Sequence, residues 1–279
     1  MIARKLFYAL SPEMRRTVRR FVYYPIDLWD DLTGKRNPMV PPKGKIYTGS
    51  GDFIASGKSL MQMCIQLSNL QPNHRVLDIG SGIGRLAIPL TEYLQSGSYE
   101  GFDVVEEGVQ WCSQQISSRY PHFKFTYVPL RNDLYNLNTV ETAANFNFPY
   151  QQNEFDLVVL TSVFTHMQQP EVAHYLKEIE RVLKPGGYCI FTAFIMNEHT
   201  ASLLKKNPHL MQFPHQFETY YLHDIKVKDA NIALKEKSLE EMIEVAGLQR
   251  EQFHWGWWRG TPRQESLNFQ DVAVLQKPL

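Results

Sequence analysis

The stretch VLDIGSGIGRLAIPL (76–90) decides the fold that the sequence predicts. It begins as an apolar strand, reaches Asp78, and then has glycine at alternate positions, Gly80, Gly82 and Gly84. Glycine lets the backbone turn tightly and approach a ligand closely, because it has no Cβ. The helix expected after this turn presents unpaired N–H groups at its start. The pattern is typical of a site for a nucleotide-like ligand.

Short runs rich in β-branched and aromatic residues follow this stretch and alternate with helical patterns, one of which runs from 171 into LKPGG (183–187). Strands are expected at 75–80, 99–105, 123–128, 155–163 and 187–196, with two more in the tail from Phe253. Strands that alternate with helices form a parallel sheet covered on both faces. The sequence therefore predicts an α/β fold, Rossmann-like, doubly wound and mostly parallel.

Two segments lie outside this alternation. Residues 1–45 form a predicted helical extension that ends in the Pro-, Gly- and Lys-rich connector 34–45. Residues 197–234 form a polar and aromatic insert before the helix expected at 237–248. We therefore expect the main domain to be 46–279, with the insert covering the substrate.

The helical pattern at 11–25 is amphipathic, with apolar Met14, Val18, Phe21 and Val22 at helical spacing. The arginines around them are Arg15, Arg16, Arg19 and Arg20. We interpret the pattern as a helix that packs on the core and keeps its basic face in solvent. A weak peripheral contact with an anionic membrane, or docking on an acidic partner, is the alternative.

Composition argues against several classes of protein. The chain has 29 basic and 29 acidic residues, so no nucleic-acid partner is expected. Its three cysteines form no C-x-x-C pair and its histidines match no metal motif, which predicts a cytoplasmic protein without a metal. No apolar run approaches the roughly 20 residues that span a bilayer. The start, interrupted by Arg4 and Lys5, does not match a signal peptide.

A second acidic residue supports the nucleotide-like interpretation. Asp103 ends the strand after the glycine loop, where a carboxylate accepts both ribose hydroxyls. A dinucleotide fingerprint is incomplete, because Arg85 stands at its last glycine position and Asp78 would repel a diphosphate. We therefore expect a cofactor that carries a cation. A nicotinamide-dependent oxidoreductase is the alternative.

Together these motifs resemble the class I S-adenosylmethionine-dependent methyltransferases. The similarity rests on the acidic and glycine positions above, on FDLVVLTSVFTH (155–166) and on RVLKPGGYCIFT (181–192), and covers about 75–195. GDFIASGKSL (51–60), SVFTHM (162–167) and FQDVAVLQK (269–277) are further similar to a bacterial small-molecule branch. The resemblance implies a seven-stranded sheet with an antiparallel C-terminal hairpin, S-adenosylmethionine as cofactor and a small-molecule acceptor.

The resemblance also implies roles for individual residues. Asp78 lies near the ammonium group of the cofactor, Asp103 near the ribose, and the loop after residue 128 near the adenine. The implied cofactor contacts are Phe53, Gly57, Asp78, Gly80, Ser81, Gly82, Gly84, Asp103, Val104, Leu130, Arg131, Thr161 and Val163. Asp133 follows later in the adenine loop than the acidic residue that relatives often have there.

His166 is the expected catalytic base, because a histidine near its ordinary pKa can remove a hydroxyl proton at neutral pH. A cap or packing role is the alternative, and a carboxylate acceptor would need no base. His166, Tyr220, Tyr221 and Trp257 are the expected substrate contacts; for the aromatic residues, packing is the alternative. We expect O-methylation of a natural-product or sugar hydroxyl. N-methylation, or a non-catalytic cofactor-binding scaffold docked through the basic helix, are the other hypotheses.

Overall fold

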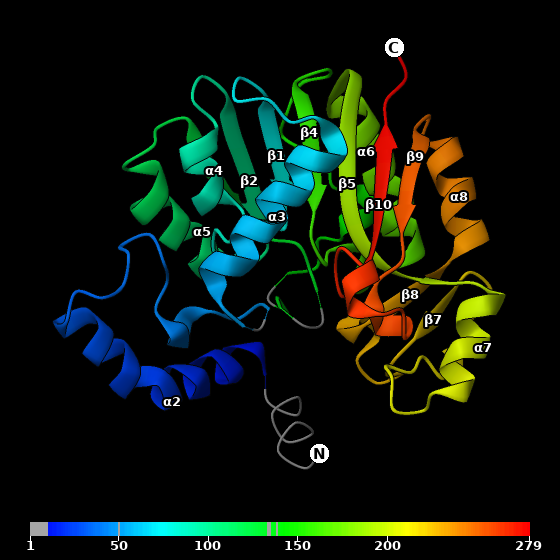
Figure 1. Cartoon of the computed structure of the whole chain (residues 1–279), viewed down its shortest axis with the longest axis horizontal. Helices are drawn as coiled ribbons and strands as arrows, with labels where there is room; N and C mark the ends of the chain where they lie inside the picture. Colours follow the sequence, from blue (N-terminus) through cyan, green and yellow to red (C-terminus); the bar gives the residue numbers. More distant parts are fainter. Residues whose placement is uncertain (1–10, 50, 133–134, 138) are drawn as a thin grey trace.

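A mixed sheet with helices on both faces forms the centre of the molecule (Figure 1). The computed structural model describes residues 11–49, 51–132, 135–137 and 139–279. The helices are α2 (Pro12–Leu32), α3 (Phe53–Ser68), α4 (Ala87–Tyr93), α5 (Glu106–Cys112), α6 (Gln169–Val182), α7 (Glu198–Lys206) and α8 (Glu236–Val245). The strands are β1 (Arg75–Ile79), β2 (Ser98–Asp103), β3 (Phe123–Tyr127), β4 (Phe155–Leu160), β5 (Leu183–Met196), β6 (His215–Gln216), β7 (Tyr220–Leu222), β8 (Ile232–Lys235), β9 (Gln249–His254) and β10 (Asp271–Gln276).

The strand order confirms the predicted α/β fold. Strands β3-β2-β1-β4-β5 lie side by side and are parallel. Strand β10 then pairs antiparallel with both β5 and β9, which completes the seven strands that the resemblance implies. Because the strand order reverses between β1 and β4, the carboxyl ends of these two strands flank the crevice where such folds bind ligands.

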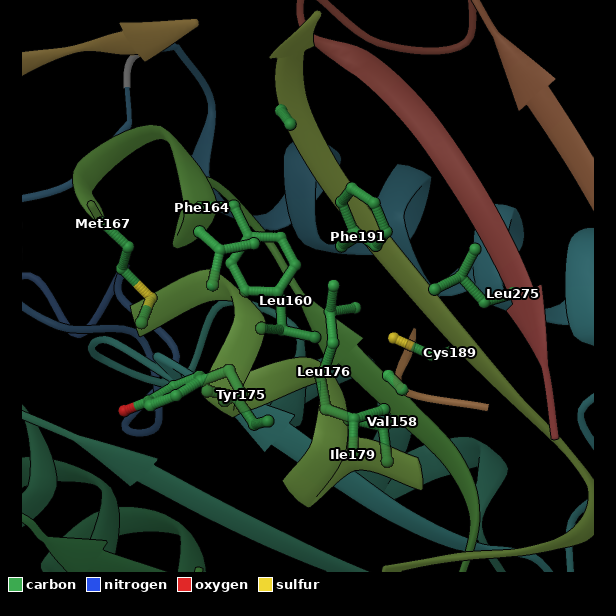
Figure 2. Packing of buried hydrophobic residues seen from close by; sticks show 14 of the residues in the cluster. Val158, Leu160, Phe164, Met167, Tyr175, Leu176, Ile179, Cys189, Phe191 and Leu275 are labelled. Atoms are coloured by element: carbon green, nitrogen blue, oxygen red, sulfur yellow. The ribbon is translucent and has the colours of Figure 1, made fainter. Parts of the chain in front are cut away.

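Two apolar layers hold the strands in place, one on each face of the sheet. Successive residues of a strand point to opposite faces. On β4, Val158 and Leu160 join the core that includes α6 and α8, whereas Leu157 and Val159 join the core that includes α3, α4 and α5. Figure 2 shows the first core, where Leu176 of α6 packs against the sheet. All five side chains are buried, so the strand ends that carry the site have a rigid support.

Some expected boundaries differ in the structure. The helix expected to end within LKPGG already ends at Val182, because Leu183 pairs with Phe155 as the first residue of β5. Strand β4 ends at Leu160 rather than at 163, since Ser162 adopts a left-handed backbone with φ of 62°.

The insert is more regular than its sequence indicated. It contains α7 and three short strands, and β8 extends the sheet by pairing parallel with the end of β5. Its strands β6 and β7 have only two and three residues, too few for a period-2 pattern to be recognised.

The interpretation of the N-terminal helix was wrong about its orientation. Helix α2 is held against η1 (Lys43–Lys45) by polar groups: Asp27 accepts hydrogen bonds from the backbone N–H groups of Lys43 (2.6 Å) and Gly44 (2.9 Å). Arg19 donates to the Lys43 carbonyl at 3.1 Å. The apolar face is therefore exposed to solvent, with Phe21 78% exposed. In the described ranges, no helix is long and apolar enough to span a bilayer.

A buried carboxyl group joins the C-terminal strands to the end of β5. Asp271 accepts hydrogen bonds from the backbone N–H groups of Ile195 and Gly256, both at 2.8 Å, and from Trp258 Nε1 at 2.9 Å. Its burial raises the pKa of Asp271 to about 7, although these donors oppose the shift.

Asp271→Ala is expected to lower the free energy of unfolding by about 3 kcal/mol or more, because each donor left unsatisfied costs about 1–3 kcal/mol. Urea unfolding at neutral pH measures this. Asp271→Asn keeps the shape and one acceptor, so its loss should be smaller. An alanine variant as stable as the wild type would show that these three contacts do not support the fold.

Candidate cofactor-binding site

The glycine loop lies at the carboxyl end of β1, and its backbone is folded back toward β2. The N–H groups of Gly80 and Ser81 both donate to the Phe102 carbonyl, at 2.9 and 3.1 Å. Gly80 has φ of 73°, a left-handed value that favours glycine. A Cβ on Gly80 would also lie 2.5 Å from Val163 Cγ2, so this turn has no room for a side chain.

Gly84, the last glycine of the loop, serves packing instead. A Cβ there would lie 2.8 Å from Ile116 Cδ1 and 3.0 Å from Cys112 Sγ. The close approach lets the chain enter α4 directly against α5 and the turn that follows it. Among the glycines expected to contact the cofactor, Gly84 therefore has a structural reason of its own.

Asp103 connects the glycine loop to the carboxyl end of β2. Its Oδ2 accepts the N–H of Gly82 and its Oδ1 that of Val105, both at 2.8 Å. Burial raises the pKa of Asp103 to about 6, although these hydrogen bonds favour the ionised form. Each carboxylate oxygen has a second lone pair. Asp103 can thus shape the loop and still accept hydrogen bonds from two neighbouring hydroxyl groups.

Asp78 lies beneath the loop in a more apolar setting. Tyr99 donates its hydroxyl proton to Asp78 Oδ2 at 2.6 Å, and burial raises the pKa of Asp78 to about 7. Tyr99 is fully buried and stacks on Phe123, so the partner of the carboxyl group is fixed. A cationic group bound nearby would favour the ionised form of Asp78.

We call the glycine loop, Asp78, Asp103 and the groups packed beside them the cradle. Two of its buried hydroxyl groups, Tyr47 Oη and Ser81 Oγ, have no hydrogen-bond partner among the described residues. Tyr47 Oη lies beside the loop, since a Cβ on Gly108 would be 2.2 Å from it and 2.5 Å from the Gly82 carbonyl. Burial and the nearby Asp103 raise the pKa of Tyr47. Buried polar atoms ordinarily have partners. The cradle therefore suits a ligand with its own hydroxyl and amino groups.

The segment before α3 is held over the loop by Arg85. Its guanidinium donates to the Thr48 carbonyl at 2.7 Å and lies 4.5 Å from the centre of the Phe53 ring. Gly57 is required by packing, because a Cβ there would lie 2.3 Å from the Arg85 carbonyl. In the sequence, Arg85 served only as an argument against a dinucleotide. Tyr47 was not predicted as a site residue, because nothing in the sequence distinguishes it from the other aromatic residues.

A cleft of about 360 Å³ opens beside Asp103 at the carboxyl ends of β2 and β3. Tyr127 at the end of β3, Val104 just after β2 and Tyr135 in the loop after β3 line one side of it. Arg16 lines it from α2. Val104, one of the expected cofactor contacts, lies in this wall. Of the two residues expected to flank the adenine, Leu130 is buried in the core and Arg131 is exposed. Asp133 lies outside the described residues, so the adenine contacts remain predictions.

His166 lies in η4 (Phe164–His166), just beyond the carboxyl end of β4. Its Nδ1 is 2.7 Å from the backbone carbonyl of Asp229, in η5 (Lys228–Ala230) of the insert, and its ring meets Tyr135 edge to face. A carbonyl can only accept, so Nδ1 carries the proton and the lone pair of the neutral ring is on Nε2. Burial lowers the pKa of His166, which keeps the ring neutral at pH 7.

The aromatic residues expected to contact substrate do not face one space. Tyr220 and Tyr221 are neighbours on β7 and point to opposite faces; Tyr220 packs against the core of α6 and α8, and Tyr221 against a smaller cluster around Phe194. Trp257 is half-buried and lies under Arg263, 5.0 Å from ring centre to guanidinium carbon. At most one of the two tyrosines can therefore line a given pocket.

A polar network that the sequence did not reveal lies beside Val163. The left-handed Ser162 donates its N–H to Thr192 Oγ1 at 2.8 Å and its hydroxyl to Gln270 Oε1 at 2.9 Å. Thr192 also donates to Gln270 at 2.5 Å. A non-glycine residue in this conformation is strained, and such strain is common at functional sites. The network fixes the strand end that carries Thr161 and Val163.

The fold and the glycine loop are those of an α/β domain whose ligand site lies at the carboxyl ends of its strands. Residues 77–191 match the family model described as "Methyltransferase domain". This domain belongs to the class I S-adenosylmethionine-dependent methyltransferases, and its cofactor is S-adenosylmethionine. The family resemblance seen in the sequence is thereby confirmed.

Known proteins similar to the chain agree with this family. It is 33% identical over 118 residues to phthiotriol/phenolphthiotriol dimycocerosates methyltransferase 1 of Mycobacterium ulcerans, and 29% identical over 118 residues to a fatty-acid O-methyltransferase of Mycolicibacterium smegmatis. Each match covers 42% of this chain and 36% of the relative. The crystal structure of an S-adenosylmethionine-dependent methyltransferase from Clostridium acetobutylicum superposes with a TM-score of 0.53 at 14% identity, covering 90% of this chain and 97% of that one. This last likeness shows the fold.

The affinity for S-adenosylmethionine is expected to increase from about pH 6 to about pH 8, because the ammonium group of the ligand favours ionised Asp78, whose pKa is about 7 in the free protein. Titration calorimetry at several pH values measures this. Removing the Tyr99 hydroxyl removes a hydrogen bond that lowers the pKa of Asp78, so Tyr99→Phe should move the dependence to higher pH. An affinity that is constant over this range would place the ammonium group away from Asp78.

Proposed function

We propose that this chain transfers the methyl group of S-adenosylmethionine to a hydroxyl oxygen of a small molecule with an apolar body, with 46–279 as the catalytic domain. The observation that carries the choice of oxygen is the contact between His166 Nδ1 and the Asp229 carbonyl, 2.7 Å apart. It leaves the lone pair of His166 on Nε2, and burial keeps the ring neutral. A neutral imidazole next to the strand end can accept a hydroxyl proton.

The loop residues would hold the cofactor. Asp103 accepts from the ribose hydroxyls, Asp78 pairs with the ammonium group, and the backbone of Gly80 to Gly82 follows the methionine part. Tyr47 and Ser81 have buried hydroxyl groups with which to complete the contacts. When bound, the cofactor supplies a methyl group on a positively charged sulfur.

His166 and the end of β4 would act on the acceptor. His166 Nε2 would accept the hydroxyl proton as the acceptor oxygen takes the methyl group that the bound cofactor would supply, with the sulfur as the leaving group. Alignment of such a displacement is worth roughly 7–11 kcal/mol in well-oriented systems. The fully buried Phe164, next to the network of Ser162, gives the turn that carries His166 a fixed position.

The apolar body of the acceptor is supported by two observations. The insert adds β8 and β7 beside the carboxyl end of β5, where Tyr220 stacks on Phe217, and small-molecule pockets are mostly apolar. The two curated relatives described above are named for dimycocerosates and for a fatty acid. A lipid-like alcohol or phenol fits both observations better than a free sugar.

Transfer of a labelled methyl group from S-adenosylmethionine tests the proposal. The acceptors are a long-chain alcohol, an alkylphenol, the corresponding fatty acid, an amine and a free sugar. We expect methyl ethers from the alcohol or the phenol. Methylation of only the amine or the fatty acid would contradict a hydroxyl acceptor, and in the latter case His166 should be dispensable.

A further inference from the structure

Helix α2 presents an apolar face to solvent. The positions of this face follow helical spacing of three and four residues, which brings them into one stripe. The apolar stripe consists of Met14, Val18, Phe21, Val22, Pro25, Leu28, Trp29 and Leu32, all of them exposed. Phe21 is 78%, Trp29 61% and Leu32 76% exposed. Surface helices ordinarily bury such a stripe in the core.

The stripe cannot turn inward without losing the contacts that hold α2. The opposite face carries Asp27, which binds the backbone of η1, and Arg20, which pairs with Glu107 at the start of α5. Arg36 lies 3.7 Å from Asp27 and supports the same connection. Because α2 attaches to the rest of the chain by its polar face, its apolar face is available to bind another surface.

Charge distinguishes the kind of surface that suits this face. Residues 11–45 carry eight basic and four acidic side chains, whereas 46–279 carry 19 basic and 25 acidic. Helix α2 itself is balanced, with four arginines and four acidic residues, so the excess of four positive charges lies in the connector 34–45 that follows it. Exposed Lys35 and Lys43 lie at the two ends of that connector. Positive charge beside an apolar stripe is complementary to a surface that is both anionic and apolar.

We propose that the apolar stripe of α2 docks on an anionic lipid bilayer. An α-helix of 21 residues is about 30 Å long and about 10 Å wide, so its stripe offers roughly 300 Å². Stable protein–protein contacts bury about 800 Å² on each partner, which makes a second copy of the chain a poor occupant of a single convex helix. Amphipathic helices with basic, tryptophan and phenylalanine residues lie in the bilayer interface.

Docking in this way would place the site next to the membrane. Figure 1 shows α2 along the end of the molecule where the carboxyl ends of β1, β2 and β4 lie. Arg16 of α2 also lines the cleft beside Asp103. An apolar acceptor dissolved in the bilayer would thus have a short path to the methyl donor. The docking surface itself lies outside the cofactor cradle and goes beyond the proposed reaction.

Sedimentation of the full chain with vesicles tests the proposal in the absence of S-adenosylmethionine. Vesicles of phosphatidylglycerol mixed with phosphatidylcholine should bind the chain, and vesicles of phosphatidylcholine alone should bind it less. In Phe21→Ser/Trp29→Ser the partition coefficient should fall at least about tenfold, since two large apolar side chains no longer enter the interface. The matched control Val245→Ser/Leu267→Ser changes exposed apolar residues on other elements and should bind like the wild type.

Three results would overturn the docking proposal: no binding of the wild type to anionic vesicles, equal binding of the α2 variant, or an equal loss in the control variant. A dimer that forms without vesicles and disappears in the α2 variant would also overturn it in favour of a second copy. Binding of S-adenosylmethionine by both variants shows that they are folded. Vesicle binding does not depend on methyl transfer. The docking proposal can therefore be tested even if the proposed reaction is not observed.

Discussion

His166→Asn is expected to lower kcat for a hydroxyl acceptor by about 10²–10⁴-fold, the usual contribution of general-base catalysis, with little change in the Kd of S-adenosylmethionine. Asparagine can still donate an N–H to the Asp229 carbonyl, so the insert should remain in place while the basic nitrogen is lost. Steady-state rates and calorimetric titration of the same preparation measure both quantities.

The pH profile separates a base from a structural residue. Burial lowers the pKa of His166, so the wild-type rate should fall only as the pH drops below the ordinary histidine range, and the residual rate of the variant should lack this step. His174→Asn is the matched control, because His174 Nε2 also lies 2.9 Å from a backbone carbonyl, that of Phe146, away from the site. Full activity in His166→Asn would assign His166 to support of the turn.

Asp103→Ala is expected to weaken S-adenosylmethionine binding by about a hundredfold or more. Hydrogen bonds to a charged group contribute about 1.5–3 kcal/mol each, and the ribose would lose two of them. The variant also removes the acceptor for the N–H groups of Gly82 and Val105, which shape the loop.

A control for the loss of a carboxylate in the sheet is available at the amino end of β4. Asp156 accepts the backbone N–H of Arg75 at 2.8 Å and pairs with Lys184, so Asp156→Ala removes a similar carboxylate far from the cradle. It should bind the cofactor like the wild type. Asp103→Asn, which keeps one acceptor oxygen, should bind with intermediate affinity. Unchanged calorimetric affinity in Asp103→Ala would remove Asp103 from the site.

The parts of the fold that the sequence predicted depend on local patterns. The apolar run into Asp78, the glycines after it and the acidic end of β2 lie within about 30 residues, and each residue type has a direct physical reason at its position. These residues come together in space because neighbouring parallel strands have their carboxyl ends on the same side of the sheet. Asp103 contacts Gly82 for this reason, 21 residues away.

The parts that could not be predicted depend on contacts between residues that are far apart in the sequence. The apolar period of α2 is clear in the sequence, but only the contacts of Asp27 and Arg19 show that this face is exposed. The proton on His166 is positioned by a backbone carbonyl, which every residue has and no residue type indicates. Tyr47 likewise owes its place to the missing side chain of Gly108, 61 positions later in the chain.

Titration calorimetry with S-adenosylmethionine, S-adenosylhomocysteine and NADH, run in parallel on the folded chain, tests the central claim most directly. The cradle of Asp78, Gly80 and Asp103 predicts that both adenosyl ligands bind and that NADH does not. Binding of NADH alone, or no heat from either adenosyl ligand, would contradict the assignment of this site.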